Sequence, residues 1–209
     1  MQRFVLRFLY SFLCRWFLKL IVGVKFINTE VLKDVPQFII LANHNSHLDT
    51  ITLLASIPSS LIHKVKPVAA GDYFGKTRLS NWLSSYFINA LLIDRKNVRS
   101  NPEEAPIPKM ISELEKGNSI ILFPEGTRGK PEELQPFKRG IGLVLAEKPE
   151  TPYIPAFLSG MGKNLPKGNT IIVPFTSSLK FGKPTFVSSR DSKEIIKQIE
   201  DDIKELKLF

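Results

Sequence analysis

Short apolar runs that end in polar turns alternate along the chain with longer segments whose apolar residues recur at helical spacing. The short runs predict strands, because a continuous apolar run fits a sheet that is covered on both faces. We expect these strands at 37–43, 65–70, 90–95, 119–122 (running into a glycine-containing loop that ends at 129), 153–158, 170–175 and 178–184. The helical segments are expected at 46–57, 74–88, 107–117, 138–148 and 191–208, and 96–106 reads as a polar loop.

Strands that alternate with helices predict an α/β fold, in which helices flank a mixed, largely parallel sheet. Ser46 is the expected N-cap of the 46–57 helix, and Gly117 marks the expected end of the 107–117 helix. We find no internal repeats and no low-complexity tract. Ligands of such sheets bind beyond the carboxyl ends of the strands, so residues that follow a strand are the first candidates for a site.

The N-terminal segment 1–29 differs from the rest. It holds no acidic residue and five basic ones, namely Arg3, Arg7, Arg15, Lys19 and Lys25. At about 100° per residue these five fall within an arc of roughly 160°, with apolar residues around the remainder. We therefore expect a basic amphipathic helix that lies on an anionic membrane surface, with Tyr10 and Trp16 at the interface. The sequence thus divides into a membrane-associating segment, 1–29, and a domain, 30–209.

Two other interpretations of this segment stay open: a helix packed on its own domain, and a targeting segment or true span. The longest run without charge, 8–14, is far shorter than the roughly 20 apolar residues that a spanning helix needs.

Net charge and cysteine content narrow the function. The formal net charge is +9, with 29 Lys and Arg against 20 Asp and Glu, which predicts an anionic partner. Nucleic acid is not expected, because zinc-finger spacing, a basic–aromatic RNA-binding motif and a heptad zipper are all missing from the sequence. The single cysteine, Cys14, excludes an internal disulfide and suits a reducing compartment.

Two of the three histidines in the chain lie in one short stretch, LANHNSHLDT, next to a carboxylate. His44, His47 and Asp49 are consistent with three explanations. The first is a zinc or iron site, although the spacing differs from the helical pattern of zinc enzymes. The second is a general base, His44, oriented by Asp49 across a strand-to-helix turn. The third is an ordinary turn in which Asp49 favours the start of a helix.

Further polar residues follow other expected strands. Arg95 ends the 90–95 strand, and the loop after 119–122 contains Glu125 and Arg128. A guanidinium group is suited to phosphate, and glycine lets backbone approach a ligand. Lys138 lies where the 138–148 helix begins, which is another natural position for an anion.

In chain order, the stretches NHNSHLD, LLIDR, FPEGTRG and YIPAF resemble the four motif blocks of the glycerolipid acyltransferase superfamily, typified by 1-acylglycerol-3-phosphate acyltransferase. The resemblance covers residues 38–158. The His-x-x-x-x-Asp motif falls on His44 and Asp49, and the phosphate-contacting arginine of the second block falls on Arg95. The third block falls on Pro124, Glu125, Gly126, Thr127 and Arg128, and the hydrophobic-proline block on Ile154 and Pro155.

The sequence departs from the family pattern at three positions. Asn89 and Leu92 replace the usual glycine and phenylalanine of the second block, and Gly129 replaces the usual serine after the third. These changes leave the expected chemistry intact but put the acyl acceptor in doubt. His47 occupies a variable position of the first block, so we assign it a secondary role.

The resemblance implies transfer of a fatty acyl group from acyl-CoA or acyl-carrier protein to a hydroxyl of a lysophospholipid, lysophosphatidate to phosphatidate. His44 is then the general base and Asp49 its orienting acid. Substrate-binding roles are implied for Arg95, Glu125, Gly126, Thr127, Arg128 and Lys138, with Glu125 touching the acceptor hydroxyl or organising the arginines.

By this resemblance no metal and no cofactor are expected, and the protein is expected at the cytoplasmic face of a membrane, peripheral or monotopic. Three alternatives remain open. One is the same chemistry on glycerol 3-phosphate, lysophosphatidylglycerol or an aminolipid precursor. The second is a metal-dependent phosphoesterase that uses His44, His47 and Asp49, and the third is a lipid-binding module without turnover.

Overall fold

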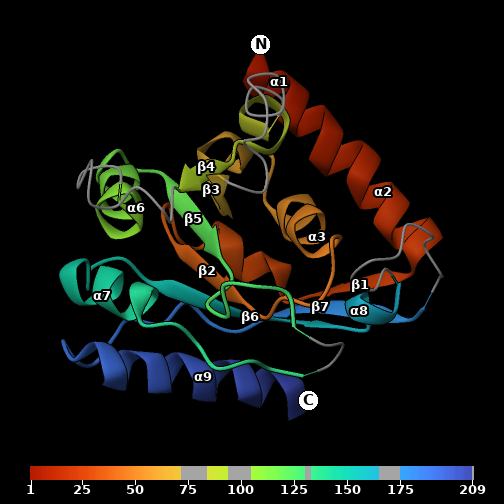
Figure 1. The fold of residues 1–209 in the computed structure, drawn as a ribbon. Helices are drawn as coiled ribbons and strands as arrows, with labels where there is room; N and C mark the ends of the chain where they lie inside the picture. The colour runs from red at the N-terminus through yellow and green to blue at the C-terminus, as the bar shows by residue number, and fades with distance from the viewer. Residues whose placement is uncertain (72–83, 94–104, 130–132, 165–174, 209) are drawn as a thin grey trace.

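A computed structural model of the chain describes residues 1–71, 84–93, 105–129, 133–164 and 175–208. One seven-stranded sheet crosses the molecule, with helices on both faces (Figure 1). Its strands follow the order β1-β7-β6-β2-β5-β3-β4, and every neighbouring pair is parallel except β6 and β7. The bounds are β1 Val24–Ile27, β2 Ile39–Ala42, β3 Val65–Ala70, β4 Leu91–Ile93, β5 Ser119–Leu122, β6 Tyr153–Ser159 and β7 Ser177–Phe181.

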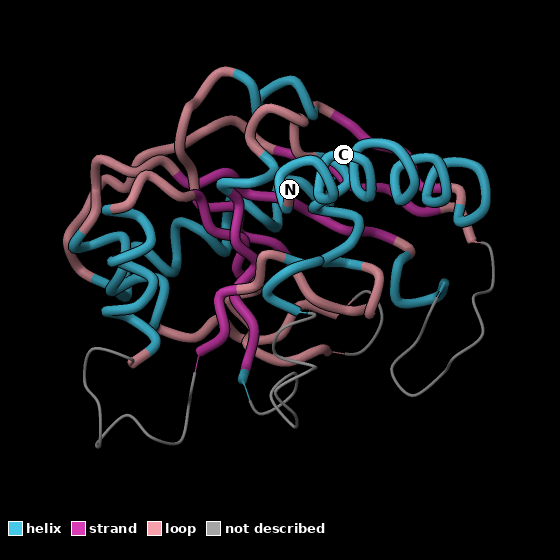
Figure 2. Tube along the Cα trace, turned by 90° about the horizontal axis from the view of Figure 1, so that it is seen from above, coloured by secondary structure: helices cyan, strands magenta, loops and turns pink. Residues whose placement is uncertain are grey.

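The expected α/β fold with a mixed, largely parallel sheet is confirmed. The strands change direction progressively across the sheet, which gives it the usual twist (Figure 2). Because side chains alternate along a strand, β2 supplies two separate cores. Ile40 and Ala42 pack on the face that carries the N-terminal helix and α3, whereas Ile39 and Leu41 pack under α6, α7 and α9. The helices on these faces are α3 Asp49–Ser56, α6 Pro106–Glu115, α7 Gly140–Glu147 and α9 Ser192–Leu208.

Most expected elements occur within a few residues of their predicted bounds. The expected helix 46–57 begins only at Asp49, because Ser46 does not act as its cap: the Ser46 Oγ accepts the N–H of Leu48 within the preceding turn. Of the expected helix 74–88, the described part is the helical turn η5, Ser84–Ile88, and the expected strand 170–175 lies almost wholly outside the described residues. Within the described ranges, the sequence did not predict β1, the turns η3 Thr29–Lys33 and η4 Ile62–Lys64, or the short helix α8 Met161–Asn164.

The chain begins with one continuous helical segment, which we call the N-terminal helix. It consists of α1 Gln2–Leu6, η1 Arg7–Cys14, α2 Arg15–Phe17 and η2 Leu18–Val22, and η1 and η2 have π-helical hydrogen bonding. It ends at Gly23, whose φ of 82° closes the helix, and β1 follows at once. The helix expected over 1–29 is therefore too long at its C-terminal end, and Lys25 lies on a strand. Among the described residues, no helix has the length and apolar character needed to cross a bilayer.

The N-terminal helix carries a four-residue repeat that our sequence reading missed. Every fourth residue from Leu6 to Val22 faces the domain: Leu6, Tyr10, Leu18 and Val22 are buried, and Cys14 is partly buried. The residues two positions away are exposed on the opposite side: Phe4, Phe8, Phe12, Trp16 and Leu20. An α-helix has about 3.6 residues per turn, so a spacing of four drifts around it. The wider i→i+5 bonding of η1 and η2 keeps the repeat in line.

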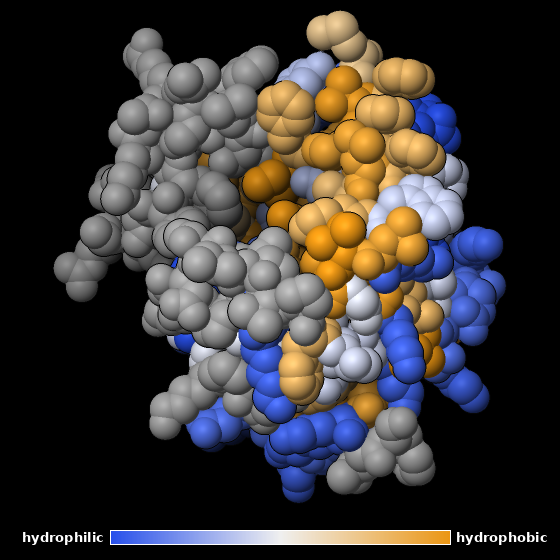
Figure 3. Space-filling model, turned by 90° about the vertical axis from the view of Figure 1, so that its right-hand side faces the viewer, coloured by the Kyte–Doolittle hydropathy of each residue, from blue (hydrophilic) through white to orange (hydrophobic). Residues whose placement is uncertain are grey.

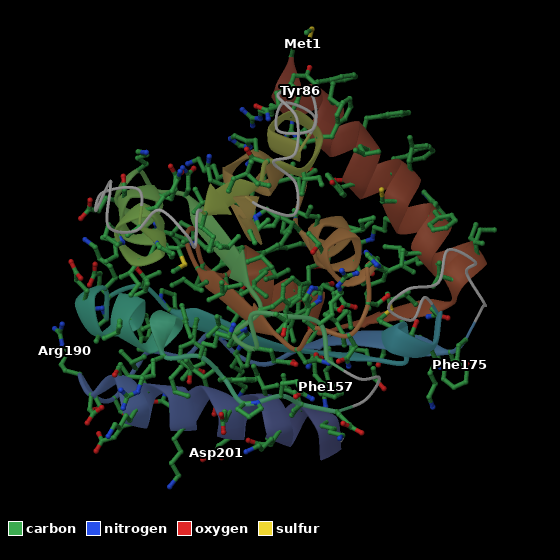
Figure 4. The ribbon with its side chains drawn as sticks, viewed as in Figure 1. Met1, Tyr86, Phe157, Phe175, Arg190 and Asp201 are labelled. Carbon is green, nitrogen blue, oxygen red and sulfur yellow. The ribbon has the colours of Figure 1, made fainter. Side chains whose placement is uncertain are left out.

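Side-chain hydrogen bonds fix the N-terminal helix to the domain. Arg7 and Arg15 donate to the carbonyl oxygens of Ser59 and Ala55 at the C-terminal end of α3 and beyond it. The Gln2 amide and the Tyr10 hydroxyl, in the first half of the helix, donate to the carbonyls of 86 and 87 in η5, and the labelled Tyr86 lies close to the start of the helix in Figure 4. Two of the basic side chains expected at a membrane surface thus also attach the helix to its own domain.

Candidate active site

The carboxyl ends of β2 and β5 place the first and third motif blocks side by side. The two strands are parallel neighbours, with Leu41 opposite Leu122. The residues that follow them, 43–48 and 123–129, therefore leave the same edge of the sheet. One backbone bond joins these two loops directly, since the N–H of Gly129 donates to the carbonyl oxygen of His44 at 2.9 Å.

His44 and Asp49 are in contact. The Nδ1 atom of His44 lies 2.9 Å from Oδ2 of Asp49, and Asp49 is fully buried at the first residue of α3. The same Oδ2 accepts the backbone N–H groups of Asn45 and Ser46, each at 2.7 Å. One carboxylate oxygen thus closes the turn and binds the imidazole. The turn brings His44 and Asp49 into contact although they are five residues apart. With its proton on Nδ1, the neutral imidazole has its basic lone pair on Nε2.

Glu125 connects the two loops from below the surface. It is buried, and its Oε1 accepts the backbone N–H of His44 at 2.9 Å while Oε2 accepts that of Gln135 at 3.3 Å. Burial raises the pKa of the Glu125 carboxyl from 4.5 to about 7; the two backbone donors oppose the rise, and the charge of Asp49 adds to it. The structure therefore gives Glu125 backbone partners, where we expected an acceptor hydroxyl or arginine side chains.

Two further residues fix the position of His44, and the sequence reading did not select either for this role. The imidazole stacks on the ring of Phe123, with centroids 4.0 Å apart and an interplanar angle of 15°. The buried side chain of Asn43 donates to the carbonyl of Leu158 on β6 and accepts its N–H. The sequence signals for Asn43 are its place directly after a fully apolar strand and at the start of the NHNSHLD block.

The glycine of the third block lies against Lys138. Gly126 has a φ of 74°, and a Cβ built there would be 2.6 Å from Nζ of Lys138. The backbone of Lys138 is held as well, because its N–H donates to the carbonyl of Pro124 at 2.9 Å. The exposed Lys138 side chain therefore lies against the 123–129 loop at Gly126, and the next residue of that loop, Thr127, is exposed. The two residues were predicted as binding residues and are brought to the same loop.

Arg128 reaches back to the first block. Its Nη1 lies 2.7 Å from Nδ1 of His47 and also contacts Nε2 of the same ring. In the part of the chain that the structure describes, no three His, Cys, Asp or Glu side chains come close enough to share a metal ion. His47 is turned towards a cation, so the arrangement gives no support to the metal-dependent alternative.

Arg95, which follows β4, lies outside the described residues, so its predicted position near the site is not described. Ile154 and Pro155 of the fourth block are buried on β6, opposite Ile40 and Leu41 of β2. They support the strand that carries His44.

The geometry combines an imidazole with a basic nitrogen, a buried carboxylate that orients it, and cationic side chains from a neighbouring loop. Such a set can remove a proton from a hydroxyl group on a substrate that carries negative charge. Its strand-to-helix turn is not a Gly-x-Ser-x-Gly elbow, because Ser46 has no flanking glycines and is fully buried.

Known proteins are similar to this chain in sequence and in fold. The chain is 33% identical over 149 residues to a 1-acyl-sn-glycerol-3-phosphate acyltransferase of Bacillus subtilis, covering 68% of this chain and 67% of the relative. It is 29% identical over 174 residues to a putative 1-acyl-sn-glycerol-3-phosphate acyltransferase of Caenorhabditis elegans, covering 76% of this chain and 62% of that protein. For a chloroplastic relative from Brassica napus the identity is 32%, and this chain spans only 36% of its length.

The crystal structure of the 1-acyl-sn-glycerophosphate (LPA) acyltransferase PlsC from Thermotoga maritima has a similar fold. The TM-score is 0.74 at 25% sequence identity, and the match covers 99% of this chain and 81% of that one. A family model described as Acyltransferase matches residues 23–177, which is well over half of the sequence. The resemblance seen in the motif blocks is thereby confirmed, and the chain belongs to the acyltransferase family.

Proposed function

We propose that the protein transfers a fatty acyl group from a thioester, acyl-CoA or acyl-carrier protein, to the free hydroxyl of lysophosphatidate. The hydroxyl oxygen attacks the thioester carbonyl as its proton passes to Nε2 of His44. The carbon–sulfur bond then breaks, and the thiolate leaves with the proton returned from the imidazolium. The products are phosphatidate and the free thiol, so the step requires no oxidant, metal or covalent enzyme intermediate.

The contact between His44 and Asp49 is the observation that carries this proposal. A carboxylate on Nδ1 fixes the tautomer that can accept a proton at Nε2, and it stabilises the imidazolium that forms. General-base assistance of this kind contributes about 10² to 10⁴ in rate. The curated relatives are named for the same reaction class, which supports the choice of acceptor.

Cationic groups around the imidazole give the acceptor phosphate a place to bind. We propose that Arg128 and Lys138 contact it, together with Arg95, and that Gly126 and Thr127 offer backbone and hydroxyl donors. Glu125 is a positioning residue in this scheme, because its buried carboxylate is bonded to the backbone of His44 and Gln135. Orienting the two substrates in this way can supply several kcal/mol of the barrier reduction.

We also propose that the N-terminal helix lies on an anionic membrane surface. Its outward residues are large and apolar, including Phe8, Phe12 and Trp16, each more than half exposed. Figure 3 shows hydrophobic side chains gathered along this face of the molecule. A helix with an exposed apolar stripe and flanking basic residues, here Arg3 and Lys19, favours a position at the boundary between lipid headgroups and acyl chains.

The decisive experiment measures acyl transfer from labelled acyl-CoA to lysophosphatidate by wild-type protein and by His44→Ala. We expect kcat to fall at least about 100-fold in the variant, with an unchanged circular dichroism spectrum. The matched control is His63→Ala, since His63 lies in η4 before β3, at the amino edge of the sheet. Comparable turnover by wild type and His44→Ala would contradict the proposed mechanism.

An acceptor panel with one labelled donor then tests the substrate. Lysophosphatidate should be acylated at higher kcat/KM than glycerol 3-phosphate, lysophosphatidylglycerol or an aminolipid precursor. A clear preference for another member of the panel would keep the reaction class and replace the acceptor. Thiol release with no acylated product would contradict transfer altogether.

A further inference from the structure

His47 and Arg128 form a contact that the proposed reaction has not used. The imidazole is exposed in the turn between β2 and α3, and the guanidinium is partly exposed at the end of the third block. They are 81 residues apart in sequence, and Nη1 of Arg128 lies 2.7 Å from Nδ1 of His47. The contact is next to the base, because Arg128 precedes Gly129, whose N–H is bonded to the His44 carbonyl.

A neutral imidazole suits this close contact better than an imidazolium, because two cations this near would repel each other and a guanidinium can only donate. Partial loss of solvent around the His47 ring lowers its pKa; the charge of Arg128, and that of His44 whenever His44 is protonated, lower it further, and Asp49 acts in the opposite direction. Among the described residues, the titratable or charged groups that act on His47 are Arg128 from the third block, His44 from its own turn and Asp49 from α3. The neutral imidazole thus lies where a phosphate oxygen could accept hydrogen bonds from the N–H groups of the Arg128 guanidinium.

We propose that His47 is a specificity-determining residue that binds the acceptor phosphate together with Arg128, exchanging its contact with the guanidinium for a phosphate oxygen. The proposal rests on the proposed function, because it concerns the same acceptor site. A phosphate monoester carries a charge of about −1.5 to −2 at pH 7, which favours the protonated imidazole as a hydrogen-bond donor. A phosphodiester carries one charge and offers fewer free oxygens. His47 therefore selects acceptors that end in a phosphate monoester.

Kinetics test the proposal with His47→Phe and His47→Gln. Acyl transfer is measured with lysophosphatidate, a monoester, and lysophosphatidylglycerol, a diester. We expect His47→Phe to raise KM for lysophosphatidate at least about tenfold, because a hydrogen bond to a charged group is lost. KM for the diester should change less, and His47→Gln, which keeps an N–H donor, should recover part of the monoester affinity. His63→Phe is the matched control and should leave both KM values unchanged.

A second measurement does not depend on turnover. The chain has only three histidines, so imidazole NMR signals can be assigned by single substitutions. Adding glycerol 3-phosphate should raise the apparent pKa of His47 by about one unit or more, whereas a glycerol phosphodiester should raise it less. Arg128→Ala should weaken the response, because the pair binds the phosphate jointly.

The outcomes separate the two proposals. Equal KM increases for both acceptors, a loss of kcat at unchanged KM, or a His47 signal that glycerol 3-phosphate does not move would each overturn the role of His47. If the wild-type protein transfers no acyl group while its His47 signal still responds to the monoester, the phosphate pair stands and only the proposed reaction fails.

Discussion

Asp49 illustrates how much depends on a single oxygen atom. Its Oδ2 accepts one imidazole N–H and two backbone N–H groups, whereas Oδ1 has no hydrogen-bond partner among the described residues. The geometry of the turn and the orientation of the base therefore cannot be changed independently. A substitution that keeps the shape and removes the charge isolates the electrostatic contribution.

Asp49→Asn is such a change. The amide oxygen can still accept the three donors, but it no longer stabilises the imidazolium that forms when the proton is taken. We expect kcat to fall about 100-fold or more, with a smaller effect on KM, in steady-state acyl transfer. The control is Asp34→Asn, an exposed aspartate at the end of η3. Turnover within a few-fold of wild type would show that the carboxylate charge plays little part.

Glu125 gives a stability prediction. Its pKa is raised from 4.5 to about 7 in the folded protein, so the folded state favours the protonated form. The associated stability is fully present below pH 4.5 and is lost as pH rises through 7, a change of about 3 kcal/mol. Glu125→Gln removes this dependence. In urea unfolding between pH 5 and pH 8, the free energy of unfolding of Glu125→Gln should rise relative to that of wild type. The control variant, Glu205→Gln, changes an exposed residue and should show no such rise. If the free energies of Glu125→Gln and wild type change in parallel with pH, the raised pKa of Glu125 is contradicted.

The sequence predicted the local part of the site and missed the distant part. His44 and Asp49 lie within one turn, so their contact follows from where the strand ends and the helix begins. The contacts of Glu125 with His44 and of Arg128 with His47 each join residues 81 positions apart. They depend on which strands become neighbours and in which register, and neither periodicity nor spacing carries that information. The motif blocks identified the residues of the site but did not indicate which of them contact one another.

At the scale of elements, apolar runs and helical spacing located most of the strands and helices because those signals come from burial. β1 was not predicted, because it is a short edge strand that follows directly on a helix and its burial pattern is uneven. Its boundary did have a signal, a glycine at the helix end, and Gly23 adopts the left-handed conformation common there. The four-residue repeat of the N-terminal helix is also visible in the sequence, but a search with the α-helical period of 3.6 residues does not detect it.

Helix α7 allows a controlled test of packing. A Cβ on Gly142 would lie 2.5 Å from the carbonyl oxygen of Ser192 in α9, whereas a Cβ on Gly140 meets nothing within 4 Å. We expect Gly142→Ala to destabilise the protein by about 1–3 kcal/mol. Gly140→Ala should cost nothing, because alanine favours helix over glycine. Urea midpoints of the two variants provide the comparison, and equal midpoints would refute close contact between α7 and α9.

At the scale of the whole molecule, α3 links the proposed membrane surface to the site. Its first residue is Asp49, and the carbonyl of Ala55 near its end accepts a hydrogen bond from Arg15 of the N-terminal helix. The exposed apolar stripe therefore has a fixed relation to the base, which would hold the active site at a constant height over the lipid. This arrangement depends on packing between segments far apart in the sequence. The sequence therefore predicted the amphipathic helix but not that it packs on α3.

Vesicle binding tests the surface. The double variant Phe12→Ala/Trp16→Ala removes two aromatic side chains that are each 53% exposed. We expect its partitioning onto anionic vesicles to fall at least about tenfold in a sedimentation assay, because apolar area is lost from the interface. Phe186→Ala is the matched control, since Phe186 is 57% exposed on the segment between β7 and α9. Equal losses in the two proteins would contradict a specific role for the N-terminal helix.

The four-residue repeat also limits how the length of the N-terminal helix can change. Inserting one residue after Tyr10 would turn everything before it by about a quarter of a circle relative to the rest. Phe4 and Phe8 would then leave the outward side, and Leu6 would lose its buried position. An insertion of four residues would restore the direction of these side chains, but it would move Gln2, Arg7 and Tyr10 one turn along the axis, away from the carbonyl groups that they bond. The helix therefore fits the domain in only one combination of rotation and axial position.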